Sequence, residues 1–138
     1  MDNVIIKERL PNVHEYLAFR KAVGWNLVNE DACKVGLDGS LYCVCAEINN
    51  KIVGIARIIG DSGLYFYIQD VIVFPEYQGL GIGGLLMDEV MDYLGKNLTS
   101  KATVGLMASK GKETFYEKYG FSRRPSDTRG HGMYKIWE

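Results

Sequence analysis

A glycine-rich turn between a strand-like run and a helix-like run places the strongest constraint on how this chain folds. Residues 71–87 are VIVFPEYQGLGIGGLLM, where β-branched residues end at a proline and Gly79, Gly81, Gly83 and Gly84 precede or open a helical pattern. The first N–H groups of a helix have no internal partner and carry the positive end of its dipole, so the arrangement favours a bound anion such as pyrophosphate. A turn built only for tight packing is the alternative. It explains so many glycines poorly, because each one weakens the start of the helix.

Two common nucleotide-binding motifs fit this turn poorly. Gly79, Gly81 and Gly84 match the G-x-G-x-x-G fingerprint, but that fingerprint needs an acidic residue roughly 20 positions further on to hold the ribose. The corresponding region, TVGLMAS, has no carboxylate, and the next one along the chain is Glu113. The ATP-type P-loop does not fit either, because no Lys followed by Ser or Thr closes the glycines.

The rest of the chain alternates between strand patterns and helix patterns. The runs LYCVCAEI and KIVGIARIIG flank an Asn-Asn turn signal and predict a β-hairpin. Apolar residues with a period of 3.6 predict an amphipathic helix after the glycine turn. We therefore expect an α/β chain with a mixed sheet. The predicted strands are 4–7, 41–48, 51–60, 64–73, 104–108 and a final hairpin after 121, and the predicted helices are 13–23, 29–40, 80–96 and 112–119.

Length and composition favour an ordinary globular protein. The chain has 138 residues, which predicts one domain over residues 1–138. Its 16 basic and 17 acidic residues give a net charge of −1, so we expect no nucleic-acid partner. Neither a membrane-spanning stretch of roughly 20 apolar residues nor a secretory signal pattern is present, so we expect no membrane association. An odd count of cysteines, Cys33, Cys43 and Cys45, predicts reduced thiols in the cytoplasm and no metal site.

Two motifs together resemble the GCN5-related N-acetyltransferase (GNAT) family. The segment YQGLGIG at 77–83 is similar to the family's Gln/Arg-x-x-Gly-x-Gly/Ala motif, and FYEKYGF at 115–121 is similar to its short helix with a tyrosine before Gly-Phe. The resemblance covers essentially the whole chain. It implies a single-domain GNAT fold with a mixed, mostly antiparallel sheet of six to seven strands, about four helices, and a splay between the strands at 64–73 and 104–108. It also implies an N-acetyltransferase that uses acetyl-coenzyme A and no metal, in a family where homodimers are common.

The resemblance also implies which residues contact the coenzyme. The backbone of Val71, Ile72 and Val73 would pair with the pantetheine arm, on a strand that carries a bulge in the family. Ser109 stands where many members have an asparagine that bonds the pantetheine, so its hydroxyl would replace part of that contact. The pyrophosphate would lie on the backbone of the glycine turn, at Gln78, Gly79, Leu80, Gly81, Ile82, Gly83 and Gly84.

Two side chains are candidates for the chemistry of amine attack on a thioester. Tyr116 matches the family tyrosine proposed to protonate the departing thiolate, and a phenol with a pKa near 10 is protonated at neutral pH. The alternative is that Tyr116 only packs its ring on the coenzyme. Asp70, directly before the pantetheine segment, has three candidate roles: general base, attractant for a cationic amine, or structural carboxylate whose backbone serves the substrate. Water is an alternative carrier for the proton.

The acceptor is the least specified part of the sequence. The segments RKAVGW at 20–25 and GMY at 132–134 resemble a subgroup that includes plant plastid acetyltransferases acting on arylalkylamines and lysine residues. In the family these regions wall the acceptor site, so Trp25 and Tyr134 are candidates for an aromatic wall, with core packing as the alternative. We expect a small primary amine with an apolar or aromatic body as the acceptor. A protein N-terminus or lysine, and a non-catalytic regulatory module that binds acetyl-coenzyme A, are the competing interpretations.

Overall fold

The computed structural model describes residues 3–138, and the chain divides into two compact units. The first unit ends at Gly105 and the second begins at Leu106. The first contains the whole sheet and the three longest helices. The second contains one short helix, α4 (Glu113–Glu117), and an extended C-terminal segment. Each unit is described by itself.

The first unit is built on a five-stranded sheet. The strands follow the order β1-β2-β3-β4-β5, so each lies beside its neighbour in sequence. The first four run antiparallel, and β5 runs parallel to β4. The mixed, mostly antiparallel sheet predicted from the sequence is therefore confirmed. The strands are β1 (Val4–Glu8), β2 (Tyr42–Ile48), β3 (Lys51–Gly60), β4 (Tyr65–Val73) and β5 (Thr103–Gly105).

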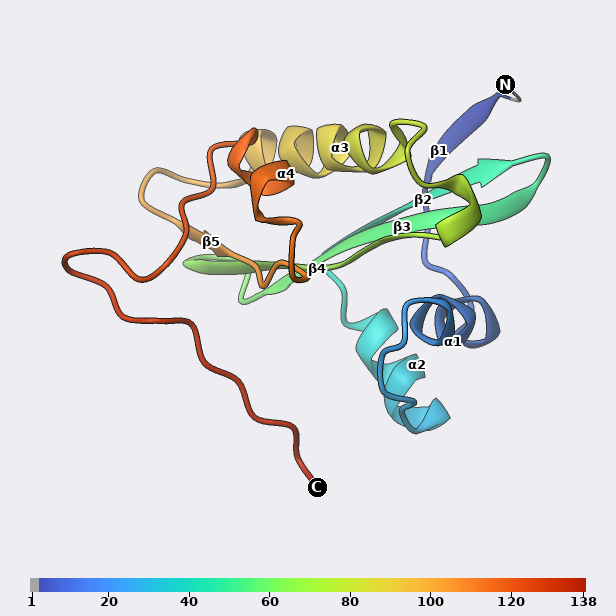
Figure 1. Cartoon of the computed structure of the whole chain (residues 1–138), viewed down its shortest axis with the longest axis horizontal. Helices are drawn as coiled ribbons and strands as arrows, with labels where there is room; N and C mark the ends of the chain where they lie inside the picture. The colour runs from blue at the N-terminus through green and yellow to red at the C-terminus, as the bar shows by residue number, and fades with distance from the viewer. Residues whose placement is uncertain (1–2) are drawn as a thin grey trace. The chain divides into compact units, whose positions relative to one another are not determined.

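Helices cover both faces of this sheet. Two helices, α1 (Val13–Ala22) and α2 (Glu30–Asp38), lie against one face, and α3 (Ile82–Asn97) lies along the other (Figure 1). Cys43 and Cys45 are two residues apart on β2, and both belong to the core cluster beneath α1 and α2. Their shared face follows from the period of two in a strand. All three cysteines are buried and free of disulfide bonds.

Close packing of α3 depends on small residues in the sheet. A Cβ at Gly54 would lie 3.0 Å from Leu86 Cδ1 and 3.4 Å from the Ala46 Cβ, so a larger side chain there would push the helix away. Ala46 and Gly54 are opposite each other in the β2–β3 ladder. The buried side chains of α3 have the helical period predicted from the sequence and are Ile82, Leu86, Met87, Val90 and Leu94.

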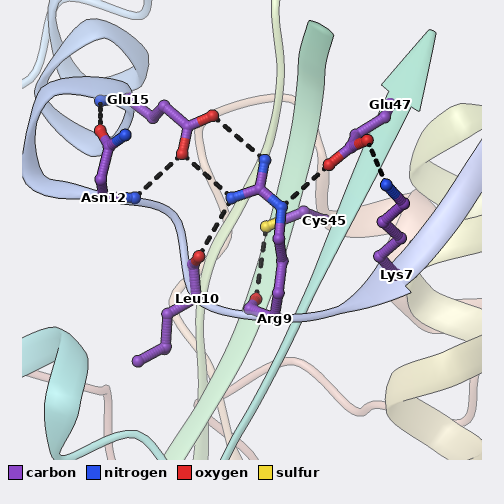
Figure 2. Close-up of polar contacts among 7 residues, drawn as sticks. All are labelled: Lys7, Arg9, Leu10, Asn12, Glu15, Cys45 and Glu47. Carbon is purple, nitrogen blue, oxygen red and sulfur yellow. Dashed lines mark hydrogen bonds and ion pairs between the residues drawn. The ribbon is translucent and has the colours of Figure 1, made fainter. Parts of the chain in front are cut away.

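A cluster of charged side chains fastens the start of α1 to the sheet (Figure 2). Arg9 donates two hydrogen bonds to Glu15, at 3.0 and 3.1 Å, and a third to Glu47, at 2.9 Å. Lys7 completes the cluster with an ion pair of 2.9 Å to the other oxygen of Glu47. Glu15 also forms a capping box with Asn12, which begins the helix. Hydrogen bonds from Arg9 hold the pKa of Glu15 below its usual value, and those from Lys7 and then Arg9 do the same for Glu47.

The predicted strand count is wrong at the C-terminal end. The sheet has five strands rather than six to seven, because residues 121–138 form no strand. Two hydrogen bonds between Ser126 and Arg129 and one from Arg124 to the Gly130 carbonyl close a local turn, but no ladder follows it. A run of apolar residues describes what a strand would bury, whereas a strand also needs a partner edge. The strand predicted over 104–108 is likewise shorter, ending at Gly105.

The remaining helix predictions hold with shifted ends. The helix after the glycine turn begins at Ile82 rather than at Leu80, because Gly81 has a left-handed backbone and acts as its N-cap. The predicted helix at 112–119 shortens to Glu113–Glu117, and Gly120 follows with φ +91. The four α-helices match the predicted number, and a short 3-10 helix, Pro75–Tyr77, precedes the glycine turn. In the described range 3–138, no helix combines the length and apolar composition that crossing a membrane requires.

Candidate active site

The glycine turn has the conformation that the sequence predicted for an anion site. Gly79 and Gly81 have φ values of +81 and +85, in the left-handed region. A residue with a Cβ pays about 1–2 kcal/mol to adopt this region. A Cβ at either position would meet no atom within 4 Å, so backbone conformation rather than space requires glycine here. The turn leads directly into α3, whose N-cap is Gly81.

Several backbone donors at this turn are available to a ligand. Over the described residues, the N–H groups of Gly79, Leu80, Gly81, Ile82 and Gly83 donate to no acceptor in the protein. Leu85 N–H makes the first helical bond at this end, to the Gly81 carbonyl at 3.2 Å. Unpaired donors at the positive end of a 16-residue helix form a site that suits a phosphate or pyrophosphate. The residues present therefore fit the pyrophosphate of a coenzyme.

The strand before the turn carries the bulge that the family resemblance implies. The β3–β4 ladder pairs Ile55 with Ile72 and Arg57 with Gln69, so a single β3 residue faces both Asp70 and Val71. Asp70 has φ +61, which is uncommon for a residue other than glycine, although Asp tolerates this region better than most. An irregularity of this kind re-aims the backbone and side chains beside it.

The pairing of β4 with β5 ends before the bulge, and the predicted splay between these strands stays a prediction. The parallel ladder joins Tyr65–Tyr67 to Thr103–Gly105 and goes no further. In the part of the chain that the structure describes, the segment Val71–Val73 therefore pairs with β3 on one edge and has no strand on the other. An unpaired strand edge is a template for an extended partner. The side chain of Gln78 reaches back to this segment and donates to the Val73 carbonyl at 3.0 Å.

Asp70 is the centre of a buried polar network. One carboxylate oxygen accepts a hydrogen bond from the Tyr16 hydroxyl at 2.8 Å and from Arg57 Nε at 2.6 Å. The other accepts from the side-chain amide of Gln69 at 3.0 Å. The residue is 2% exposed, so its charge depends on these partners. Arg57 also donates to the Ser40 hydroxyl at 3.1 Å, which extends the network to the residues after α2.

Trp25 lies beside this network and not in the deepest core. It is partly buried against the cluster that contains Tyr16 and Phe19. Arg20 lies 5.7 Å from the centre of the Trp25 ring and 5.9 Å from that of Tyr16, so its cation faces both rings. Arg20 also donates to the Asn26 carbonyl at 2.7 Å and fixes the loop after α1. Trp25 thus takes part in core packing and also contributes to the surface of the first unit.

Three predicted site residues belong to the second unit. Tyr116 is half-buried on α4, with its ring 5.0 Å edge-on from Phe115, and burial raises the pKa of its phenol. A raised pKa keeps the hydroxyl protonated at neutral pH, as a proton donor requires. Ser109 and Tyr134 are both exposed, Tyr134 to 77%. Among the described residues, no group of three or more His, Cys, Asp or Glu side chains is arranged to hold a metal ion.

The partners of Asp70 were not predicted from the sequence. Tyr16 follows the helical period of α1 like an ordinary core residue, and Arg57 lies in a strand that otherwise predicts full burial. An arginine inside a buried strand was the available signal, because such a cation needs an acidic partner. Asp70 is the only acidic residue of β4 and was therefore a candidate for that partner.

Comparison with known proteins agrees with this geometry. The family model described as an acetyltransferase (GNAT) domain matches residues 17–135. The glycine turn that opens α3 and the bulge in β4 are consistent with that family. The chain belongs to the GNAT family and is an N-acetyltransferase; the family typically uses acetyl-coenzyme A as its second substrate.

Individual relatives support the same family. The N-acetyltransferase ycf52 of Pyropia yezoensis is 30% identical over 127 residues, covering 89% of this chain and 72% of that protein. GCN5-related N-acetyltransferase 2, a chloroplastic protein of Arabidopsis thaliana, is 32% identical over 84 residues, covering 61% and 32%. A crystal structure of a protein of unknown function from meticillin-resistant Staphylococcus aureus has a TM-score of 0.89 and 30% identity, covering 98% of this chain and 100% of that one. These relatives confirm the resemblance to the GNAT family, and they include a chloroplastic plant protein.

Proposed function

We propose that this protein transfers the acetyl group of acetyl-coenzyme A to the primary amine of a small molecule. The observation that carries the proposal is that the first unit has two features together. One is the set of unpaired N–H groups at the start of α3, and the other is the open edge of β4 beside them. A coenzyme with a pyrophosphate and an extended amide-bearing arm has the chemistry to bind both. A cytoplasmic location stays a prediction, supported by the three free cysteines.

The coenzyme is proposed to bind along a continuous backbone surface. The pyrophosphate would accept hydrogen bonds from the N–H groups of residues 79–83, where Gly79 and Gly81 provide the left-handed conformation. The pantetheine amides would pair with the edge of Val71–Val73, and the coenzyme contact that the family resemblance implies for Ser109 stays a prediction. A main-chain surface of this kind binds the coenzyme without relying on charged side chains. The bound coenzyme supplies an activated acetyl group as a thioester.

Tyr116 is proposed as the proton donor to the thiolate that leaves. Its raised pKa favours the protonated phenol over the whole neutral range. A backbone N–H at the bulge is proposed to polarise the thioester carbonyl, because a fixed donor stabilises the charge that develops on that oxygen. The incoming amine must be neutral when it attacks, so kcat/KM is expected to rise with pH toward the pKa of the amine.

The proposed acceptor is a primary amine with an apolar or aromatic body. Trp25 offers a partly buried aromatic surface in the first unit, and Tyr134 offers an exposed ring in the second. Small-molecule sites commonly combine apolar walls with a few placed polar groups. Trp25→Ala should therefore lower kcat/KM for a phenylethylamine-like acceptor roughly tenfold more than for a polyamine. Equal losses for the two acceptors would leave Trp25 as a packing residue.

The proposal is tested by measuring free thiol released from acetyl-coenzyme A in the presence of different acceptors. The panel contains arylalkylamines, polyamines, and peptides with a free N-terminus or an internal lysine. Turnover with free amines supports the proposal. Turnover with peptides alone would identify a protein acetyltransferase instead. Binding of acetyl-coenzyme A without turnover of any acceptor would indicate a regulatory module.

A further inference from the structure

The hydrogen-bond network around Asp70 connects the bulge in β4 to three other elements of the first unit, α1, α2 and β3. Tyr16 comes from α1, Arg57 from β3 and Gln69 from β4 itself. Arg57 extends the connection toward α2 through the Ser40 hydroxyl and, at 3.4 Å, the Gly36 carbonyl. The Asp70 side chain is fully buried, and that of Arg57 is 12% exposed. The two charges therefore neutralise each other inside the protein.

These contacts argue against a free carboxylate at this position. Both oxygens of Asp70 already accept hydrogen bonds, and the shortest comes from a guanidinium. A general base must take a proton, and a proton on Asp70 would leave the Arg57 cation buried without a partner. An ammonium attractant must present an uncompensated negative charge, which the ion pair with Arg57 removes. The carboxylate of Asp70, with its hydrogen bonds and ion pair in place, is available for neither role.

The same contacts account for the unusual backbone of Asp70. A glycine would adopt φ +61 without strain, yet the chain has a residue whose carboxylate is held by three side-chain donors. Those donors hold the residue in the left-handed conformation that makes the bulge. The next residue is Val71, which begins the segment whose outer edge has no strand partner. The ion pair therefore anchors the residue directly before the Val71 N–H.

We infer that Asp70 is a positioning residue, which acts with Arg57 and Tyr16 to hold the bulge so that the Val71 N–H points at the thioester carbonyl. The inference rests on the proposed function and refines it. The amine then loses its proton to water, and Asp70 stays ionised through the reaction.

A double-mutant cycle tests this inference with the full chain and acetyl-coenzyme A. If the Arg57–Asp70 pair acts as a unit, Asp70→Asn and Arg57→Met should each lower kcat by about tenfold. The double variant should then lose about as much as either single variant, because the second substitution removes a group that has already lost its partner. Losses that multiply to about a hundredfold would overturn the inference. Tyr16→Phe, which keeps the ring and removes one donor, should lower kcat by a few fold.

The pH profile separates a positioning residue from a general base. The other titratable or charged groups that interact with Asp70 or its partners are Tyr16 and Arg20 on α1, Cys33 on α2, Cys43 on β2 and Arg57 on β3. Burial raises the pKa of both Tyr16 and Cys33, and the neighbouring Cys45 raises that of Cys43, so these three side chains do not begin to titrate in the acid range. In the Asp70→Asn variant, the plot of log(kcat/KM) against pH should have the same shape as that of the wild type, with lower kcat/KM at every pH. Loss of an acid-side inflection in that variant would show a base and overturn the inference.

Glu47→Gln is the matched control. Glu47 is a buried carboxylate, 6% exposed, that is held by Lys7 and Arg9 on β1 and its C-terminal side, away from the bulge. This variant should lose stability but keep wild-type kcat well below its melting temperature. Should Arg57→Met fail to fold, Tyr16→Phe and Asp70→Asn still decide the matter: a folded Tyr16→Phe with wild-type kcat would contradict the inference. A wild-type protein without any transfer activity would overturn the proposed function itself, and acetyl-coenzyme A affinity by calorimetry distinguishes the two failures.

Discussion

A single negative charge at the start of α3 should weaken coenzyme binding by an amount that the structure predicts. Gly81 is the N-cap of α3 with φ +85, and a Cβ there would meet no atom within 4 Å. Asp and Asn are the residues after glycine that best tolerate this conformation. Gly81→Asp and Gly81→Asn should therefore pay a similar backbone cost of about 1 kcal/mol and cause no steric clash. They differ only in charge.

That difference isolates the anion site. Two unit charges about 4 Å apart repel by about 1 kcal/mol in water and by about 4 kcal/mol in a partly buried site. The Asp variant should thus bind acetyl-coenzyme A between roughly fivefold and roughly 1,000-fold more weakly than the Asn variant. The difference should shrink as salt is added, because screening weakens exposed charges.

Calorimetric titration of both variants with acetyl-coenzyme A measures this ratio directly. Circular dichroism melting curves should be similar for the two, which confirms that the backbone cost is shared. Equal affinities in two folded variants would refute the reasoning, because an anion at these N–H groups must respond to a charge on the N-cap.

Three further predictions concern Tyr116, Glu47 and the C-terminal segment. Tyr116→Phe keeps the ring and removes the hydroxyl, so kcat should fall tenfold or more, about 1.4 kcal/mol, with little change in KM for the coenzyme; wild-type kcat where chemistry limits turnover would make Tyr116 a packing residue. Glu47→Gln should cost about 1–2 kcal/mol of stability at pH 7 by urea unfolding. Because Lys7 and Arg9 lower the pKa of Glu47, that stabilisation is present above the unfolded pKa of about 4.3 and disappears as pH falls through the folded value, so the two proteins should converge in acid. The exposed apolar side chains between 133 and 137 favour association of two copies, so light scattering should give a dimer for the full chain and a monomer after truncation at Gly132.

Local signals were sufficient to predict most of the first unit. The hairpin β2–β3 was specified by alternation and an Asn-Asn turn, and both asparagines have positive φ in the structure. Glycine is the residue that adopts the left-handed conformation of the turn at 79–81 without strain. The turn forms where its glycines predicted it. Such features are readable because the residue type and the backbone state are linked within a few positions.

The network around Asp70 was not predictable in the same way. Tyr16 and Arg57 lie 54 and 13 residues before Asp70, and each also fits an ordinary local pattern. A carboxylate directly before Val71–Val73 is compatible with a general base, an attractant for a cationic amine or a structural ion pair, because the three roles differ only in what surrounds the carboxylate. Burial and partners decide among them, and both arise from the packing of α1 and β3 on β4.

The C-terminal segment shows where a correct local pattern gives a wrong structure. Residues 133–137 are mostly apolar, and the residues before them do form a turn. Yet the four large apolar side chains of this segment are 53–87% exposed, and no ladder joins them to anything in the described chain. An apolar run states what a strand would bury, but the hydrogen bonds that make it a strand belong to a second edge. The five strands that form lie in the sheet in their sequence order, and no strand follows β5 in the described chain. Its pattern is therefore that of a strand whose partner edge the local sequence does not supply.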